Sequence, residues 1–184
     1  MKRFIAMLLI LCSALLMTAA FAEEAAPEAK ITVVEQRFIN MEDNGHGFFF
    51  AKVQNTGDAA GYVDYKGNIV ASDAEGNIIL TENYVSTAPD EVYLEPGEYA
   101  YVCENIYDDA LDTAEVADCK FSIRAVDNGD AYAKLAAEAK IHYEPDEEDD
   151  NYVDVTFTNT TDEILYDYKI VAALYDQNLS LIHI

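Results

Sequence analysis

The chain of 184 residues contains no tryptophan, three cysteines and few basic residues. It has 11 lysines and arginines against 35 aspartates and glutamates, which gives a formal net charge of -24. A surface with this charge repels phosphate groups, so nucleic acids and anionic membranes are poor partners. Hydrophobic residues still make up 51% of the chain and tyrosine occurs 13 times. The composition therefore predicts a folded protein rather than a disordered one.

The sequence also lacks the patterns that accompany common catalytic chemistries. It contains no Gly-x-Ser-x-Gly segment, no cysteine–histidine arrangement and no glycine-rich phosphate loop. His46, His142 and His183 have no cysteine, histidine or carboxylate at the spacing of a metal site. We therefore predict that the protein is not an enzyme and has no catalytic residues.

The amino-terminal residues have the pattern of a secretory signal peptide. A basic start over 1–3 precedes an apolar run over 4–17, and small residues then lead to a cleavage point after Ala22. The run is shorter than the roughly 20 residues of a membrane span, although an uncleaved anchor helix is the alternative. We expect a signal peptide at 1–22, a flexible lead-in at 23–29, and a secreted or cell-surface protein without a membrane span after cleavage.

Two cysteines remain after the signal peptide is removed. Cys103 and Cys119 could pair in an exported protein, because disulfides persist in oxidising compartments. Two reduced thiols are the alternative, and a single widely spaced pair leaves both open.

The rest of the chain has the pattern of short β-strands between polar turns. Alternation indicates a half-buried strand at 48–55, with Phe49, Ala51 and Val53 on one face. The predicted strands of this first part are 31–38, 48–55, 62–72, 77–85, 99–103 and 119–126. Polar turns separate them, including a tight hairpin at 73–77 and a Pro-Gly turn at 95–98. This spacing indicates an antiparallel sandwich or barrel. The segment 105–117 could be a short helix or an acidic loop.

The pattern then begins again about 100 residues later. The segment VQNTGDAAGYVDYK (53–66) has an echo in FTNTTDEILYDYK (157–169), where turn residues and the Asp-Tyr-Lys group recur. The inward positions of 49–53 likewise correspond to those of 153–157. Such a repeat indicates a duplicated domain rather than a solenoid. We predict three strands in the second copy, at 134–142, 152–159 and 165–176.

These motifs resemble the FxLyD-type immunoglobulin-like domains of bacterial cell-envelope and secreted proteins. The resemblance rests on an alternating strand running into Asn-Thr-x-Asp, on Leu-Tyr-Asp at 174–176, and on Leu-Glu-Pro-Gly-Glu at 94–98 before an aromatic strand. The first copy departs from it at 71–73, where Ala-Ser-Asp replaces Leu-Tyr-Asp. The resemblance implies an extracellular β-sandwich with no catalytic residues to transfer.

The predicted organisation is therefore two immunoglobulin-like sandwiches in tandem, of which the second is incomplete. The first covers 30–126, a linker covers 127–133, and a partial second copy covers 134–178. We expect a structural, adhesive or protein-interaction role at the bacterial cell envelope, with an unidentified protein or cell-wall component as partner.

Calcium or carbohydrate binding is the alternative function. Five adjacent carboxylates, Asp146, Glu147, Glu148, Asp149 and Asp150, occupy one predicted hairpin loop. Oxygen-rich loops suit calcium, but this loop lacks EF-hand spacing, and charge runs in loops are commonly just solvated. Carbohydrate candidates are Tyr99, Tyr101 and Tyr107, although tyrosine is frequent in any strand. No cofactor other than calcium is expected.

The last six residues, LSLIHI at 179–184, match the translation of a DNA sequence used in the laboratory. Their codons can be written CTG TCT CTT ATA CAC ATC, which is a transposon end used as an adapter in DNA sequencing libraries. We predict that 179–184 is an adapter artefact and that the genuine sequence is lost after Asn178. The alternative is a real carboxy-terminal strand. Sequencing genomic DNA past codon 178 distinguishes them: a stop after Ile184 would contradict the artefact, and a Leu-x-Pro-Gly turn with an aromatic strand would support it.

Overall fold

The computed structural model describes residues 26–41, 45–127, 134–135, 137–142, 152–162, 164–166, 169–175 and 181–183. In these ranges every paired strand is antiparallel to its neighbour, and the one helix is the short 3-10 helix η1 (Asp109–Asp112). The strands are β1 (Ile31–Asn40), β2 (His46–Asn55), β3 (Gly61–Val63), β4 (Gly67–Ser72), β5 (Ile78–Val85), β6 (Tyr93–Leu94), β7 (Tyr99–Tyr107), β8 (Asp118–Ser122), β9 (Ala125–Val126), β10 (Ala137–His142), β11 (Tyr152–Phe157), β12 (Leu174–Tyr175) and β13 (Leu181–His183). The predicted all-β, antiparallel sandwich class is confirmed.

The first layer of the sandwich is a sheet with β2 between β1 and β7. β2 alternates as its sequence predicts, since Phe49, Ala51 and Val53 are fully buried while Lys52 and Gln54 on the other face are partly exposed. Both edges of β2 are paired along its whole length. β2 is therefore the central strand of this layer.

The second layer consists of two short sheets, with strand orders β5-β4-β8 and β6-β3-β9. A single strand is predicted over 62–72, but it is interrupted at 64–66, opposite the break between β8 and β9. Asp64 explains this bend: its amide donates to the Arg124 carbonyl at 2.9 Å, and its carboxylate accepts from Arg124 Nε at 2.8 Å. The Asp-Tyr-Lys group is thus a structural bend in the first copy.

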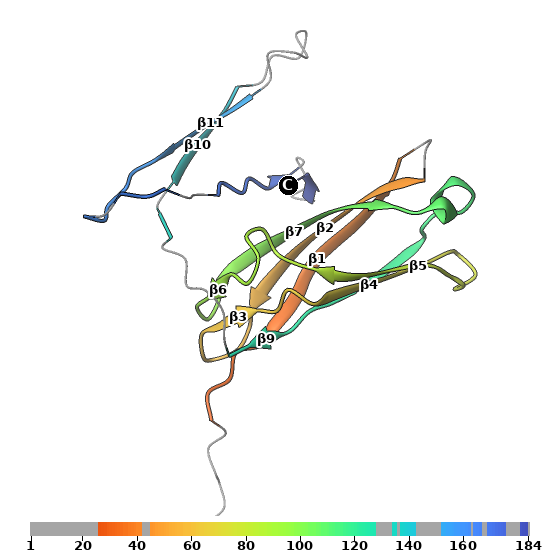
Figure 1. The fold of residues 1–184 in the computed structure, drawn as a ribbon, viewed down its shortest axis with the longest axis horizontal. Helices are drawn as coiled ribbons and strands as arrows, with labels where there is room; N and C mark the ends of the chain where they lie inside the picture. Colours follow the sequence, from red (N-terminus) through yellow and green to blue (C-terminus); the bar gives the residue numbers. More distant parts are fainter. Residues whose placement is uncertain are drawn as a thin grey trace, which may run out of the picture.

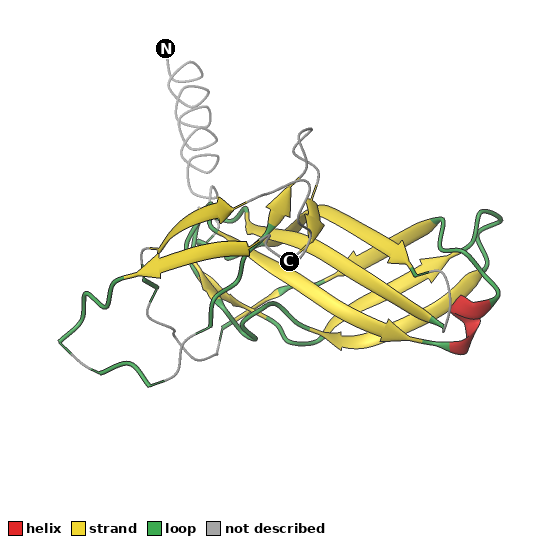
Figure 2. Cartoon of the chain, turned by 90° about the horizontal axis from the view of Figure 1, so that it is seen from above, coloured by secondary structure: helices red, strands yellow, loops and turns green. Residues whose placement is uncertain are grey.

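The two layers enclose a single apolar core (Figure 1 and Figure 2). Phe49 of β2 packs against Phe121 of β8, with ring centres 5.2 Å apart. Gln36 of β1 closes one edge, because its amide nitrogen donates to the Cys119 carbonyl and its oxygen accepts from the Phe121 amide at 3.3 Å. The side chain thereby substitutes for a backbone ladder between β1 and β8.

The predicted turns of the first sandwich are present. The hairpin between β4 and β5 has Gly76 at φ +84°, and Asp73 accepts from the Asn77 amide at 2.8 Å. The Pro-Gly turn before β7 has Gly97 at φ +87°. β7 is longer than predicted and reaches Tyr107. The segment 105–117, for which the sequence allowed a short helix or an acidic loop, is therefore the end of β7 followed by η1 and a loop.

The chain beyond the first sandwich forms two hairpins in its described part. β10 pairs with β11, and this hairpin projects from the sandwich in Figure 1. β12 pairs with β13, and β13 lies against β1 and β2. The strand predicted over 165–176 is observed only at Leu174–Tyr175; 164–166 and 169–173 are not strand. No ladder partner for those residues occurs within the described ranges, which accounts for the difference.

Several sequence predictions fall outside the described residues. They are the signal peptide at 1–22, all of the predicted linker except Asp127, and the acidic loop at 146–150. Residues 181–183 form a strand, as the alternative interpretation of the tail expects. Strand pairing does not report on the origin of the DNA, so the adapter origin stays a prediction.

Candidate functional site

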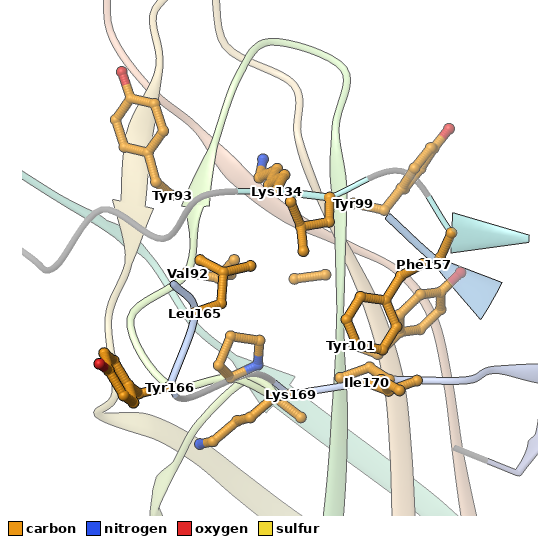
Figure 3. A pocket seen from close by; sticks show the side chains of 16 residues that line it. Val92, Tyr93, Tyr99, Tyr101, Lys134, Phe157, Leu165, Tyr166, Lys169 and Ile170 are labelled. Carbon is orange, nitrogen blue, oxygen red and sulfur yellow. The ribbon is translucent and has the colours of Figure 1, made fainter. Parts of the chain in front are cut away.

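A groove of about 890 Å³ lies where the first sandwich meets the chain that follows it. The first sandwich supplies the segment leading into β6 and the start of β7, and the later chain supplies residues on both sides of β11. Figure 3 shows these side chains around a common space. We name it the junction groove and define it by Tyr93, Tyr99, Tyr101, Lys134, Phe157 and Tyr166.

An aromatic cluster around one lysine borders the groove. Lys52 Nζ lies 4.1 Å from the ring centre of Tyr99 and 5.8 Å from that of Tyr175. The Tyr175 hydroxyl donates to the Tyr101 hydroxyl at 3.3 Å. Burial raises the pKa of Tyr101 to about 12. The cluster joins β2, β7 and β12, so both parts of the chain contribute to it.

The polar side chains of the groove are of two kinds, phenol hydroxyls and ammonium groups. The polar side chains that line it within the described ranges are tyrosines and two lysines, Lys134 and Lys169. Lys134 forms an ion pair with Glu98 at the rim, and its hydrogen bond holds the pKa of Glu98 below its usual value. The lining therefore offers aromatic faces, aliphatic surface and hydrogen-bond donors, but no carboxylate or amide side chain.

This chemistry suits a polypeptide better than a sugar. Sugar hydroxyls are commonly bound by carboxylates, which accept, and by amides, which accept and donate. Here only the tyrosine hydroxyls can accept, because the ammonium groups only donate. Apolar side chains fit the aliphatic and aromatic walls, and backbone carbonyl oxygens fit the donors. Tyrosine is also enriched at protein interfaces, because one side chain combines a large apolar body with a polar tip.

The three tyrosines proposed for carbohydrate binding are not brought together. Tyr99 and Tyr101 lie at the groove, but Tyr107 is at the opposite end of β7. There its ring stacks on His46, with ring centres 4.3 Å apart and planes 3° from parallel. Tyr99 and Tyr101 could therefore face one ligand together, whereas Tyr107 lies apart from them.

No calcium site can be built from the described residues. The candidate loop at 146–150 lies outside them, and within them no three His, Cys, Asp or Glu side chains cluster as metal ligands would. His142 lies next to that loop in sequence and pairs with Asp154, at 2.8 Å from Nε2 to the carboxylate. Calcium binding by 146–150 stays a prediction.

Cys103 and Cys119 are free thiols on different layers of the sandwich. Cys103 lies on the outer face of β7, because the buried residues Ala100 and Val102 are on the other face. Cys119 belongs to the core. A disulfide would require one of the two side chains to pass through its own sheet. In this structure the two cysteines are therefore free thiols. Burial raises the pKa of both thiols, that of Cys119 to about 11.

Sequence reasoning found part of the groove and missed the rest. Tyr99 and Tyr101 were among the candidates, but Lys134, Phe157 and Tyr166 were not. The sequence repeat could have pointed to Phe157. This residue corresponds to Val53, which is buried in the first sandwich, but it lies in a segment that is predicted to lack a complete core. A large aromatic residue at an incompletely covered position is a candidate for an interface.

Comparison of the chain with protein-family models, with curated proteins and with solved structures returns no match. The resemblance to FxLyD-type domains therefore remains a prediction from the motifs alone. In the described part of the chain, no helix has the length and apolar character needed to cross a membrane.

Proposed function

We propose that this chain is an exported, non-enzymatic protein of the bacterial cell envelope, built from immunoglobulin-like modules, that binds another polypeptide in a structural or adhesive role. The observation that carries the proposal is the junction groove, with its aromatic and aliphatic walls and lysine donors. Export and the bacterial envelope are supported by the signal-peptide pattern and by the FxLyD-like motifs.

The charge of the chain also bears on the partner. A protein with a formal charge of -24 attracts basic or neutral surfaces and repels acidic ones. Lys134 and Lys169 present donors in the groove, in contrast to the acidic chain as a whole. A polypeptide whose backbone carbonyls enter the groove, and whose flanks carry basic residues, satisfies both features.

Site-specific photo-crosslinking tests this function. A photoreactive residue replaces Tyr166, which is 83% exposed and lines the groove. The matched control carries it at Ile78 on β5, which is 68% exposed and is not a lining residue. We expect protease-sensitive adducts at position 166 in the producing bacterium and none at position 78. Equal labelling at both positions, or no adducts at all, would contradict polypeptide binding.

Carbohydrate binding remains the second candidate, because the half-exposed Tyr99 and its neighbour Tyr101 still offer aromatic faces. Calorimetry of the full chain against a glycan panel and against calcium separates it from the first proposal. Saturable heat with a glycan, lost in Tyr99→Ala, would favour the sugar. We expect no saturable heat from either titration.

A further inference from the structure

The predicted repeat allows β2 and β11 to be compared position by position. Val53 in β2 and Phe157 in β11 are equivalent, because each lies two residues before an asparagine that starts the next turn. The side chain of each asparagine accepts a hydrogen bond from the amide two residues later, at 3.0 Å for Asn55 and 2.9 Å for Asn159. Positions 48 and 50 of β2 therefore correspond to 152 and 154 of β11.

The outward positions of these two strands differ in chemistry. Phe48 and Phe50 lie on the outer face of β2, since the alternate residues belong to the core. Tyr152 and Asp154 occupy the equivalent positions of β11, and both are exposed. A carboxylate suits a face in contact with water, whereas adjacent phenylalanines suit a face that another surface covers.

Phe50 is covered, although it points away from the core. Its ring is parallel to that of Phe48, with ring centres 6.0 Å apart, and only 1% of the residue is exposed. Arg37 of β1 and Cys103 of β7 lie beside it in the sheet. Side chains of one sheet stand side by side, so these neighbours flank the ring rather than cap it. Another segment therefore lies over this face.

Tyr175 of β12 contacts the same face in the next row of side chains. Its hydroxyl donates to the Tyr101 hydroxyl at 3.3 Å, and its ring centre lies 5.8 Å from Lys52 Nζ. Lys52 and Tyr101 are directly opposite in the β2–β7 ladder, one outward row from Phe50. The later part of the chain thus reaches the outer face of the first sheet through a tyrosine.

The repeat also gives Tyr175 an outward position in its own copy. Leu174 and Tyr175 correspond to Ala71 and Ser72 of β4, in the Leu-Tyr-Asp and Ala-Ser-Asp segments. Ala71 is fully buried in the first core, whereas Ser72 faces outward and is partly exposed. A tyrosine in place of this small serine supplies a large apolar body with a polar tip, which is typical of interfaces.

We propose that the outer face of β1, β2 and β7 is the docking surface for the later copy of the repeat in the same chain, with Tyr175 as the anchor. Lys134, paired with Glu98 just before β7, holds the beginning of the later copy at the same end of this face. The two copies then form a fixed pair rather than two modules that move independently. Tyr101 belongs both to this face and to the junction groove, so docking also fixes the walls of the groove.

Photochemical coupling of tyrosines in the full chain tests the inference. Brief photo-oxidation joins tyrosine rings that are in contact, and mass spectrometry of the digested protein identifies the joined pair. We expect Tyr175 to couple to Tyr99 or Tyr101 within one chain. Tyr175 pairs with Leu181 in the β12–β13 ladder, so a chain ended at Asn178 separates the two contributions, and it should keep this coupling.

Two substitutions on the face should weaken the docking. Phe50→Asp introduces the residue of the equivalent position in β11, and we expect it to lower the coupling yield at least about fivefold, because docking would bury an unpaired carboxylate. Lys52→Asp removes the cation beside Tyr175 and should lower the yield at least about threefold. Lys52 is half-buried and lies outside the core, so this variant decides the matter if Phe50→Asp does not fold. Ile78→Asp, at an exposed position of the second layer, is the matched control and should leave the yield unchanged.

Several results would overturn the inference. They are the absence of coupling from Tyr175 to Tyr99 or Tyr101, an unchanged yield in both face variants, and an equal loss in Ile78→Asp. Coupling found only between two chains would make a second molecule the occupant, and its loss in the chain ended at Asn178 would assign the contact to 179–184. In each case protein adducts at position 166 would still support the proposed polypeptide binding, which has its own crosslinking test.

Discussion

The two hairpins β1–β2 and β10–β11 show how much of a strand's burial comes from its neighbours. Both are antiparallel, and β2 and β11 share their alternation and the asparagine turn, although β1–β2 alone has a register shift, between Val33 and Glu35. Phe49, Ala51 and Val53 are nevertheless fully buried, while the corresponding residues of β11 are half-exposed. The difference lies in β7 and the second layer, which cover the first hairpin. Equivalent local sequences thus give equivalent hairpins, and long-range partners decide whether a core forms.

The largest expected effect is on the core beneath the first hairpin. Phe49→Ala removes a fully buried ring that packs on Phe121, and we expect it to lower the free energy of unfolding by about 3–5 kcal/mol. Val153→Ala, at the equivalent position of β11, should cost less than about 1 kcal/mol. Urea denaturation of both variants measures the difference. Equal losses would mean that β11 belongs to a core as complete as that of β2.

The next effect concerns the repeated asparagine. Asn55 is fully buried and its side chain bonds to Lys30, Gly57, Ala59 and Leu94. Asn55→Ala leaves the buried Leu94 carbonyl without this partner, at about 1–3 kcal/mol, and also removes three part-buried bonds.

Asn159→Ala is the matched variant for this comparison. Because Asn159 is exposed, water can replace its contacts, and we expect a loss within about 0.5 kcal/mol. The same urea titration serves both variants. A loss at Asn159 as large as that at Asn55 would show that the second turn is already docked.

Each layer of the sandwich carries one cysteine, and the reactivities of these two thiols can be compared. Cys103 is half-buried and Cys119 is buried in the core, and both pKa values are raised by burial. We expect slow alkylation at Cys103 and none at Cys119 in the native protein at pH 8, because the thiolate is the reactive form. Unfolding in urea without reductant should make both react. If the intact mass showed that the unfolded protein had gained no alkyl groups, the two cysteines would not be free thiols.

The smallest expected effect is on the contact between the two parts of the chain. The pKa of Tyr101 is raised to about 12 by burial, so folding favours the neutral phenol. Its contribution to stability is complete below the unfolded pKa of about 10 and is lost as the pH rises through 12. Tyr101→Phe should reduce the fall in unfolding free energy between pH 10 and 12. An unchanged slope would contradict this assignment.

The sequence predicted those features of the fold that depend on neighbouring residues. Alternation identified β2, and glycine in the turns identified the hairpin at Gly76 and the turn at Gly97, where φ is positive. These signals are local because side-chain parity and backbone handedness are properties of short segments.

Features that depend on distant partners were not predicted. The break after β3 arises because Asp64 bonds to Arg124, sixty residues away in the chain. Within the strand expected over 165–176, the described residues 165–166 and 169–173 are not strand, since strand propensity without a ladder partner does not suffice. The junction groove needs the two parts of the chain to meet, which no spacing of residues reveals.

The central claim is that β11 is an open counterpart of β2, and amide hydrogen exchange of the full chain without any ligand tests it most directly. Amides of β2, paired on both edges, should exchange only through global unfolding of the sandwich. Those of β11, for which the described residues supply a ladder on one edge, should exchange at least about a hundredfold faster through local opening. Protection of β11 equal to that of β2 would contradict the claim, because a second strand would then already occupy its edge.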